Sequence, residues 1–204
     1  MGEIIISNVI GTAIPKPEPD QNTDDILPAR FLREITFTDM GLFVYFDERF
    51  RDGDPAKVVQ AHPFNDLKYR GASILIAGAN YGCGSSREHA PQGLKRYGIN
   101  AIIAPSFAEI FAGNCASLGI VGVTVPEQDL SGLLMGARQG DTAFDIDLTE
   151  KLIKYGLKEK LAFDIPEGRR QAFLGGTWDA MAVLQRDQAG IKRTGAGLEY
   201  LSYQ

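Results

Sequence analysis

Short apolar runs alternate with amphipathic stretches through the middle of the chain. The mostly apolar runs at residues 73–77, 101–104 and 120–125 predict buried strands, and the stretches at 91–97 and 107–115 predict the helices between them. Strands that alternate with helices in this way pair in parallel through right-handed crossovers. This part of the chain therefore predicts an α/β architecture with a mostly parallel central sheet and flanking helices.

A different periodicity follows in the C-terminal part. Residues 143–148 (AFDIDL) alternate apolar and polar side chains, and residues 151–155 and 160–165 continue the alternation around a turn at Gly156. This pattern predicts a small antiparallel meander beside the parallel sheet. Residues 168–188 predict one or two helices, interrupted by a pair of glycines.

The first 35 residues and the C-terminal residues give weaker patterns. Residues 4–6 predict a short opening strand, and residues 29–35 predict a short helix. The proline-rich stretch at 15–25 predicts an extended loop, because proline donates no hydrogen bond to a helix or a strand ladder. We expect one domain over residues 1–188, followed by a C-terminal tail over residues 189–204.

Composition narrows the class of protein. The 204 residues are 44% hydrophobic and 23% charged, which is ordinary for a globular domain. The net charge of −5, with scattered basic residues, disfavours nucleic acid as a partner. No apolar run approaches the roughly 20 residues that span a membrane, and the N-terminal residues lack the pattern of a secretory signal. Two cysteines, Cys83 and Cys115, are too few for a disulfide framework or an iron–sulfur cluster, so we expect a cytoplasmic chain that binds no metal itself.

The most informative motif is GANYGCGSSREHAP at residues 78–91, directly after a predicted strand. Three glycines in seven residues let the backbone turn tightly and approach a ligand closely. A turn between a strand and a helix directs backbone N–H groups at an anion. Arg87 adds a planar pair of donors, and Ser85 and Ser86 add hydroxyls. The motif predicts an anion-binding site with an acid–base serine at the carboxyl edge of the sheet.

Structural roles for the same residues stay open at this point. Ser85 and Glu88 have the spacing of a capping box at a helix start, although Pro91 opposes a helix that begins at Ser85. Arg87 could instead form a surface ion pair with Glu88 or Glu109. The motif has neither the spacing of a P-loop nor that of a dinucleotide-binding fingerprint.

Other polar residues near the motif have simple structural interpretations. Ser106 suits a helix N-cap, and Asn114 suits the C-terminal end of a helix. His89 suits a structural hydrogen bond, and Cys83 suits a small packed side chain. Asp24 lies in an acidic pair typical of a solvated turn, and it gains a function only if its loop folds back over the glycine-rich motif.

Three runs of sequence resemble one known family. The runs GCGSSREHAP (residues 82–91), NTDDILPARFL (22–32) and IIAPSFAEIF (102–111) closely resemble the small subunits of 3-isopropylmalate dehydratases, members of the aconitase superfamily. The resemblance extends more weakly from about residue 4 to about residue 188. It implies a swivelling β/β/α domain of the aconitase C-terminal type. It also implies a large partner subunit that carries a [4Fe–4S] cluster and a small hydroxy-dicarboxylate substrate, with no cofactor bound by this chain.

The resemblance also implies roles for individual residues. Ser85 matches the serine that acts as an alkoxide base and removes a proton from the carbon next to the departing hydroxyl. The cluster iron takes that hydroxyl. Because a free serine hydroxyl is a very weak acid, loop N–H groups and Arg87 must stabilise its oxyanion. Ser86 and Arg87, with Gly84 in the same loop, match residues that hold a substrate carboxylate. Asp24 matches the second aspartate of the family's Asp-Thr-Asp motif, which orders charged groups in the active site.

Two departures from the family pattern bear on the substrate more than on the reaction. Asn22 replaces the first aspartate of the Asp-Thr-Asp motif, whereas Asp24 is kept. Arg33 resembles an arginine that meets an extra carboxylate in homoaconitase small subunits. Isopropylmalate isomerisation in leucine biosynthesis is the expected activity. Citramalate, dimethylmalate and homoaconitate are the alternative substrates, and a non-catalytic carboxylate-binding module is the alternative from another class.

Overall fold

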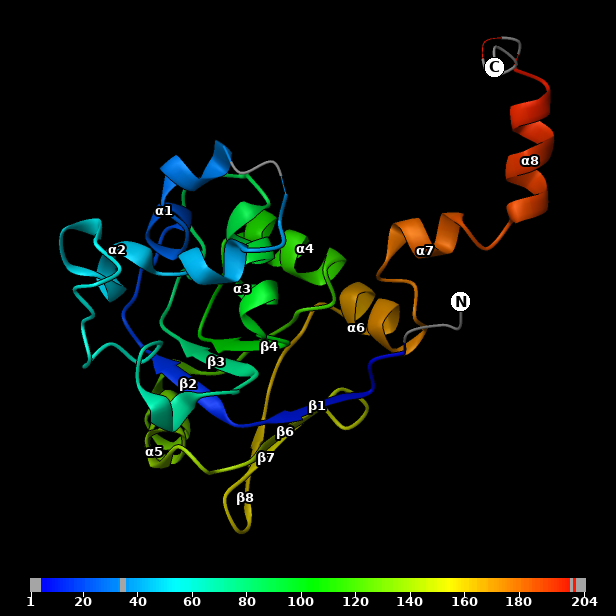
Figure 1. The fold of residues 1–204 in the computed structure, drawn as a ribbon. Helices are drawn as coiled ribbons and strands as arrows, with labels where there is room; N and C mark the ends of the chain where they lie inside the picture. The colour runs from blue at the N-terminus through cyan, green and yellow to red at the C-terminus, as the bar shows by residue number, and fades with distance from the viewer. Residues whose placement is uncertain (1–4, 34–35, 199, 201–204) are drawn as a thin grey trace.

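Two four-stranded sheets organise the chain in the computed structural model, which describes residues 5–33, 36–198 and 200. The parallel sheet has the strand order β2–β3–β4–β5, and the antiparallel sheet has the order β1–β6–β7–β8 (Figure 1). The strands are β1 (Asn8–Gly11), β2 (Ala13–Lys16), β3 (Ile74–Ala77), β4 (Ala101–Ala104), β5 (Val121–Thr124), β6 (Phe144–Asp147), β7 (Leu152–Tyr155) and β8 (Glu159–Ala162).

Helices of very different length connect these strands. The α-helices are α1 (Thr23–Ile26), α2 (Phe46–Arg49), α3 (His89–Tyr97), α4 (Glu109–Ser117), α5 (Leu130–Gln139), α6 (Glu167–Leu174), α7 (Ala180–Leu184) and α8 (Gln188–Ala196). The 3-10 helices are η1 (Ala29–Arg33), η2 (Met40–Phe43), η3 (Arg51–Gly53), η4 (Leu67–Tyr69) and η5 (Glu127–Asp129). None of the helices within the described ranges is long and apolar enough to cross a membrane.

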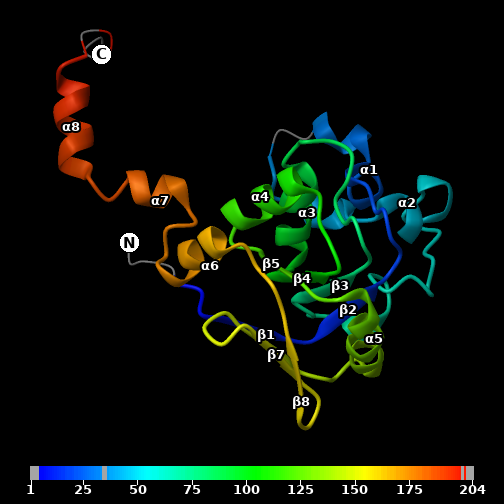
Figure 2. The ribbon, with the colours of Figure 1, turned by 180° about the vertical axis from the view of Figure 1, so that it is seen from behind.

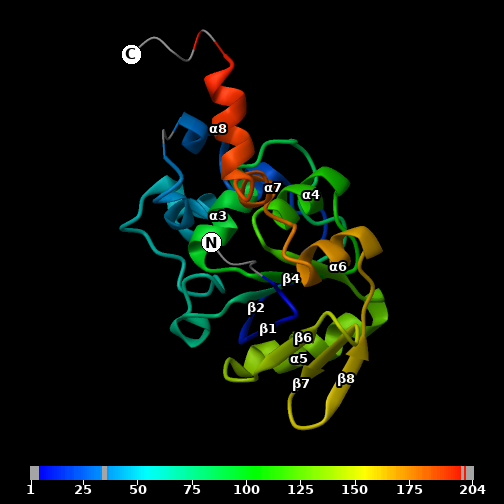
Figure 3. The ribbon, with the colours of Figure 1, turned by 90° about the vertical axis from the view of Figure 1, so that its right-hand side faces the viewer.

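The layers follow from the alternation of side chains along the parallel strands. Ile14, Leu75 and Ile102 face a hydrophobic cluster covered by α3 and α4. The neighbouring Ile74 and Ile103 face a second cluster, which α5 and the antiparallel sheet cover. Figures 1 and 3 show the antiparallel sheet on the side of the parallel sheet away from α3 and α4. The predicted β/β/α architecture, with a mostly parallel central sheet and an antiparallel meander, is confirmed.

The extended loop predicted for residues 15–25 is wrong at both ends, where strand β2 and helix α1 lie. Pro15 lies opposite Ile76 in the parallel pairing of β2 with β3, and α1 occupies the other end of the predicted loop. Because β2 is an edge strand of the described sheet, the missing N–H of Pro15 costs no pairing on the open side. Within the predicted loop, only residues 17–22 lie outside a helix or an extended strand.

The opening strand is also displaced from its predicted position. Residue 4 lies outside the described residues, and Ile5 and Ile6 are not in a strand. Strand β1 begins at Asn8 instead, because pairing with β6 buries Val9 against the second hydrophobic cluster. The short helix predicted over residues 29–35 is the 3-10 helix η1, and residues 34–35 lie outside the described part of the chain.

The C-terminal segment is helical beyond the expected boundary. The break between α6 and α7 falls at the predicted glycine pair, Gly175 and Gly176. Helix α8 occupies part of the segment expected to be a tail. Figures 1, 2 and 3 agree that α7 and α8, coloured orange and red, stand away from the two sheets. The domain boundary near residue 188 stays a prediction.

Candidate active site

Residues 18–24 run alongside the glycine–serine loop, which comprises residues 78–88 between β3 and α3. The parallel pairing of β2 with β3 continues beyond the sheet as a series of backbone hydrogen bonds. These bonds join Asp20 N–H to Ala79 C=O (2.9 Å), Gly82 N–H to Gln21 C=O (2.8 Å) and Thr23 N–H to Cys83 C=O (2.8 Å). The proline-rich segment therefore folds back over the loop, which is the condition that Asp24 needed for a functional role.

Asn22 shows why its departure from the family pattern is tolerated. Its side-chain oxygen accepts hydrogen bonds from the backbone N–H groups of Asp24 (2.7 Å) and Asp25 (2.9 Å), and its own N–H donates to the Asp25 carboxylate. This arrangement is the N-terminal cap of α1. Because asparagine and aspartate cap helices about equally well, the substitution keeps Asp24 in place.

Two glycines let the loop pack closely against its neighbours, Gly82 against helix α4 and Gly84 beside Asn22 and Thr23. Gly82 has a φ of +78°, and a Cβ atom built on it would lie 2.1 Å from the Cγ atom of Phe111 on α4. Gly84 has a φ of +95°, in the left-handed region that side chains rarely adopt. A side chain at Gly82 would thus push the loop away from the helix that supports it.

Ser85 does not cap a helix, so that structural interpretation is wrong. Helix α3 begins at His89, and its N-cap residue is Glu88, whose side chain makes no capping bond. Pro91 favours this later start, because proline is best tolerated in the first turn of a helix. The N–H of Ser85 donates to the Thr23 hydroxyl at 3.0 Å, so the serine is fixed from across the loop.

Arg87 provides two donors to the Ser85 hydroxyl oxygen. Its side-chain Nε lies 2.8 Å from Ser85 Oγ, and its backbone N lies 3.3 Å away. On the other side of the guanidinium, Nη2 lies 4.0 Å from an Asp24 carboxylate oxygen. Donors aimed at one oxygen stabilise that oxygen when it carries negative charge. The arrangement therefore suits a serine that functions as an alkoxide.

The alternative ion pairs proposed for Arg87 do not form. The Glu88 carboxylate accepts a hydrogen bond from Gln92 on the next turn of α3. Glu109 instead pairs with Arg169 at the start of α6. The Arg87 guanidinium is left directed at Ser85 and Asp24.

The predicted site residues are largely open to solvent. Ser85 is half-buried, whereas Ser86 and Gly84 are exposed. The Arg87 and Asp24 side chains are 50% and 58% exposed. Because charge interactions are weak in water, this loop alone is a poor place to hold an alkoxide. A second surface that covers the loop would strengthen every one of these contacts.

Two polar residues of the site were given only structural roles by sequence reasoning. Asn114 is interior to α4, and its Nδ2 donates to the Ser86 carbonyl at 3.1 Å. Ser106 is not the N-cap of α4, which is Ala108; its Oγ accepts the Asn80 N–H at 2.8 Å. The usable signal was Asn114 itself, because asparagine is disfavoured inside helices unless its side chain has a tertiary partner.

Arg33 is not brought to the loop by this chain. It is an exposed residue at the end of η1. Within the described ranges, no hydrogen bond or ion pair joins it to Ser85, Arg87 or Asp24. A role in substrate choice would require a substrate or partner that bridges the gap.

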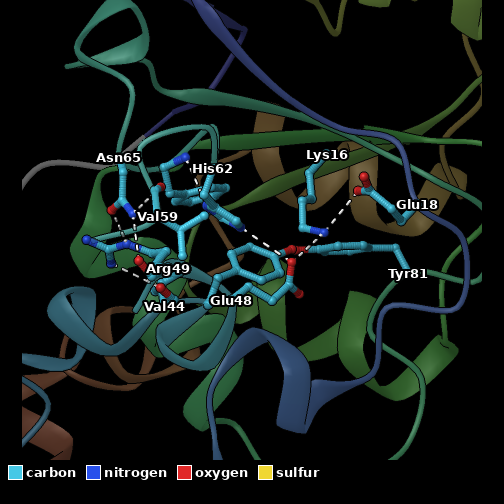
Figure 4. Close-up of polar contacts among 11 residues, drawn as sticks. Lys16, Glu18, Val44, Glu48, Arg49, Val59, His62, Asn65 and Tyr81 are labelled. Carbon is cyan, nitrogen blue, oxygen red and sulfur yellow. Dashed lines mark hydrogen bonds and ion pairs between the residues drawn. The ribbon is translucent and has the colours of Figure 1, made fainter. Parts of the chain in front are cut away.

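A partly buried polar cluster lies at the carboxyl end of β2. Figure 4 shows the Lys16 ammonium between two carboxylates, 2.9 Å from Glu18 and 3.0 Å from Glu48, and His62 Nε2 approaches Glu48 at 3.4 Å. Lys16 is only 4% exposed, so this pairing satisfies a charge that would otherwise be costly to bury. Burial acts to raise the pKa of Glu48, but His62 and Lys16 outweigh it and lower that pKa.

The same cluster supports the glycine–serine loop. The hydroxyls of Tyr45 and Tyr81 lie 2.7 Å apart, and Tyr81 belongs to the loop. Burial raises the pKa of both phenols, so they remain neutral hydrogen-bonding groups. The Tyr45 N–H donates to the carbonyl of Ile26 at 2.8 Å. Tyr45 therefore links α1, which carries Asp24, to the loop that carries Ser85.

The two cysteines are poorly suited to hold a metal ion. Burial raises the pKa of the Cys115 thiol, which disfavours the thiolate form that binds metals. Cys83 is half-buried, with Sγ 3.4 Å from the Asp20 carbonyl. The part of the chain that the structure describes contains no group of three or more His, Cys, Asp or Glu side chains placed to hold a metal ion. These residues do not fit an iron–sulfur cluster, which usually needs three or four thiolates.

Comparisons with known proteins agree with the fold. A family model described as the aconitase C-terminal domain matches residues 5–128, which include every predicted site residue. The 3-isopropylmalate dehydratase small subunit of Synechocystis is 38% identical over 200 residues, covering 98% of this chain and 96% of that protein. The corresponding protein of Thermus thermophilus is 42% identical over 176 residues, covering 85% of each chain. This chain belongs to the family of 3-isopropylmalate dehydratase small subunits.

A solved member of the family has the same fold. The crystal structure of the 3-isopropylmalate dehydratase from Methanocaldococcus jannaschii superposes with a TM-score of 0.60 at 26% identity, covering 89% of this chain and 99% of that one. The resemblance carried by the three sequence runs is confirmed at the level of family and fold.

Proposed function

We propose that this chain is the subunit that supplies the catalytic base of a 3-isopropylmalate dehydratase. The enzyme interconverts 2-isopropylmalate and 3-isopropylmalate by dehydration and rehydration. The names of its relatives support the reaction. One observation supports the role of the chain: the Ser85 oxygen is aligned with two donors of Arg87.

In this mechanism Ser85 transfers one proton in each direction. Its alkoxide takes the proton from the carbon adjacent to the one that loses hydroxide, and a double bond forms between them. In the return step the serine hydroxyl gives its proton to the carbon that lost hydroxide, and a hydroxide equivalent to the one released adds to the other carbon, so the serine is again an alkoxide. The N–H and Nε of Arg87 stabilise the serine oxygen whenever it is negative.

We expect the exposed part of the loop to bind the substrate. The outer nitrogens of Arg87 offer planar donors suited to a carboxylate, and Ser86 and Gly84 are exposed in the same loop. Asp24 faces the same guanidinium and would keep it oriented when the site is empty.

A large subunit is the expected partner, because the loop is too exposed to work alone. We propose that this subunit covers the loop and carries the [4Fe–4S] cluster, since the cysteines of the described chain do not fit one. This chain then contributes the base and the carboxylate contacts. A cytoplasmic location is part of the same proposal.

The test is a substrate panel on the reconstituted complex. The chain is mixed anaerobically with the large subunit of a 3-isopropylmalate dehydratase from the same organism, and turnover is measured on isopropylmalate, citramalate, dimethylmalate and a homocitrate-type substrate. The proposal expects turnover of isopropylmalate. Activity only on the longer tricarboxylic acid would contradict the substrate and direct attention to Arg33. A stable complex with an intact cluster and no turnover at all would favour a carboxylate-binding module.

A further inference from the structure

One peptide unit connects helix α4 to the Ser85 oxygen. The carbonyl of the Ser86–Arg87 peptide accepts a hydrogen bond from Asn114 Nδ2 at 3.1 Å. The N–H of the same peptide donates to Ser85 Oγ at 3.3 Å. Asn114 and Ser85 thus lie on opposite sides of a single amide group.

The geometry of the peptide makes this connection directional. The peptide is planar and trans, as are all peptide bonds of the described residues, so its C=O and N–H point in opposite directions. Fixing the carbonyl therefore fixes where the N–H points. A donor on the carbonyl also polarises the amide, which makes its N–H a stronger donor to the serine oxygen.

Helix α4 gives Asn114 a stable base. Phe111 and Cys115, on the same helix, are 2% exposed and belong to the hydrophobic cluster beneath the loop. The Phe111 ring lies against Gly82 of the loop, so the helix packs directly on the loop. Asn114 is itself half-buried, and its carboxamide has this one hydrogen bond to the loop.

We propose that Asn114 is a positioning residue for the Ser85 base and acts through the Ser86–Arg87 peptide. It keeps the backbone N–H of Arg87 directed at the serine oxygen and so stabilises the alkoxide. The inference rests on the proposed function, because it needs Ser85 to be the base. Asn114 touches neither the substrate nor the reacting proton.

The test uses three variants in the reconstituted holoenzyme. Asn114→Ala removes the donor, Asn114→Asp keeps the shape but replaces the NH2 donor with an acceptor, and Asn114→Gln keeps the donor on a longer side chain. We expect kcat to fall about tenfold or more for Ala and Asp, as is common when a residue that orients a catalytic group is lost, with KM changed less than twofold. Asn114→Gln should recover part of the loss. The pH at which kcat/KM is half-maximal should rise for Ala and Asp.

A matched control separates this effect from general loss of stability. Asn8→Ala removes an exposed carboxamide that also donates one hydrogen bond, to Asp145 in the antiparallel sheet, and should leave kcat unchanged. Full activity in Asn114→Asp would overturn the proposal, because shape alone would then suffice. Loss of turnover in Ser85→Ala with unchanged Asn114→Ala would overturn only this inference. Unchanged turnover in Ser85→Ala would instead overturn the proposed function.

Discussion

The parallel and antiparallel sheets share a hydrophobic cluster, yet every predicted site residue lies in a connection of the parallel one. Ser85 and Arg87 follow β3, and Asp24 follows β2. The antiparallel strands β6–β8 contribute buried side chains such as Ile146 and Ile153 and no predicted site residue. The aconitase family model ends at residue 128, before β6 begins. The predicted site residues thus gather at the carboxyl edge of the parallel sheet, whereas the antiparallel sheet covers one of its faces.

The two sheets also differ in how they are buried. Strands β2, β3 and β4 are buried along their whole length, because helices cover one face and the second sheet covers the other. Strand β8 lies at the edge of the antiparallel sheet and is mostly exposed. Substitutions in the two regions should therefore separate turnover from stability.

Arg87→Lys should have a large effect on the parallel side, through loss of kcat/KM and not through loss of stability. Lysine keeps a positive charge but loses the Nε donor that lies 2.8 Å from Ser85 Oγ. Loss of one donor to an oxyanion lowers the rate by about 10²–10³-fold, so kcat/KM should fall by about that factor. Steady-state kinetics of the complex measure this, and an unchanged midpoint of thermal unfolding would confirm that the fold is intact.

Ile153→Ala should show the opposite behaviour. Ile153 is fully buried in β7, opposite Ile146, so the substitution leaves a cavity in the second hydrophobic cluster. We expect the free energy of unfolding to fall by about 2–5 kcal/mol. Urea unfolding measures the change, while kcat per folded complex should match the wild type. A large loss of kcat at full occupancy would show that the antiparallel sheet also governs the site.

Glu48→Gln tests whether the polar cluster around Lys16 stabilises the fold in a pH-dependent way. The folded state lowers the pKa of Glu48 below its unfolded value of about 4.3, so the ionised carboxylate adds stability above that pH. That contribution is lost as the pH falls through the folded pKa. Wild type should thus be more stable than Glu48→Gln at pH 7, and the difference should shrink below about pH 4. A difference independent of pH would exclude the carboxylate charge as its source.

Leu157→Ser should have the smallest effect. Leu157 is 97% exposed in the turn between β7 and β8, so almost no apolar contact is lost. The free energy of unfolding should stay within about 0.5 kcal/mol, and kcat should not change. A measurable loss of activity would indicate that this turn touches the large subunit.

Sequence patterns predicted those parts that depend on local order. The parallel strands β3–β5, the meander and the glycine–serine motif all follow from apolar periodicity and glycine spacing within a few residues. Strand β2 escaped prediction because Pro15 normally opposes a strand, and only its place at a sheet edge makes it acceptable.

The site required contacts between distant segments, which local patterns do not contain. The spacing of Ser85 and Glu88 fits a capping box, but the partner that fixes Ser85 is Thr23, 62 positions earlier in the chain. Asn114 reaches Ser86 from a helix 28 positions later. The family resemblance named Ser85, Arg87 and Asp24, and their proximity came from the fold.

The most direct test of the account compares Ser85→Ala with Ser86→Ala in the reconstituted complex. Loss of the base should lower kcat by about 10²–10⁴-fold or more with little change in KM, whereas loss of the neighbouring hydroxyl should mainly raise KM. Both variants should bind the large subunit as the wild type does. A Ser85→Ala complex that turns over isopropylmalate at the wild-type kcat would contradict the account.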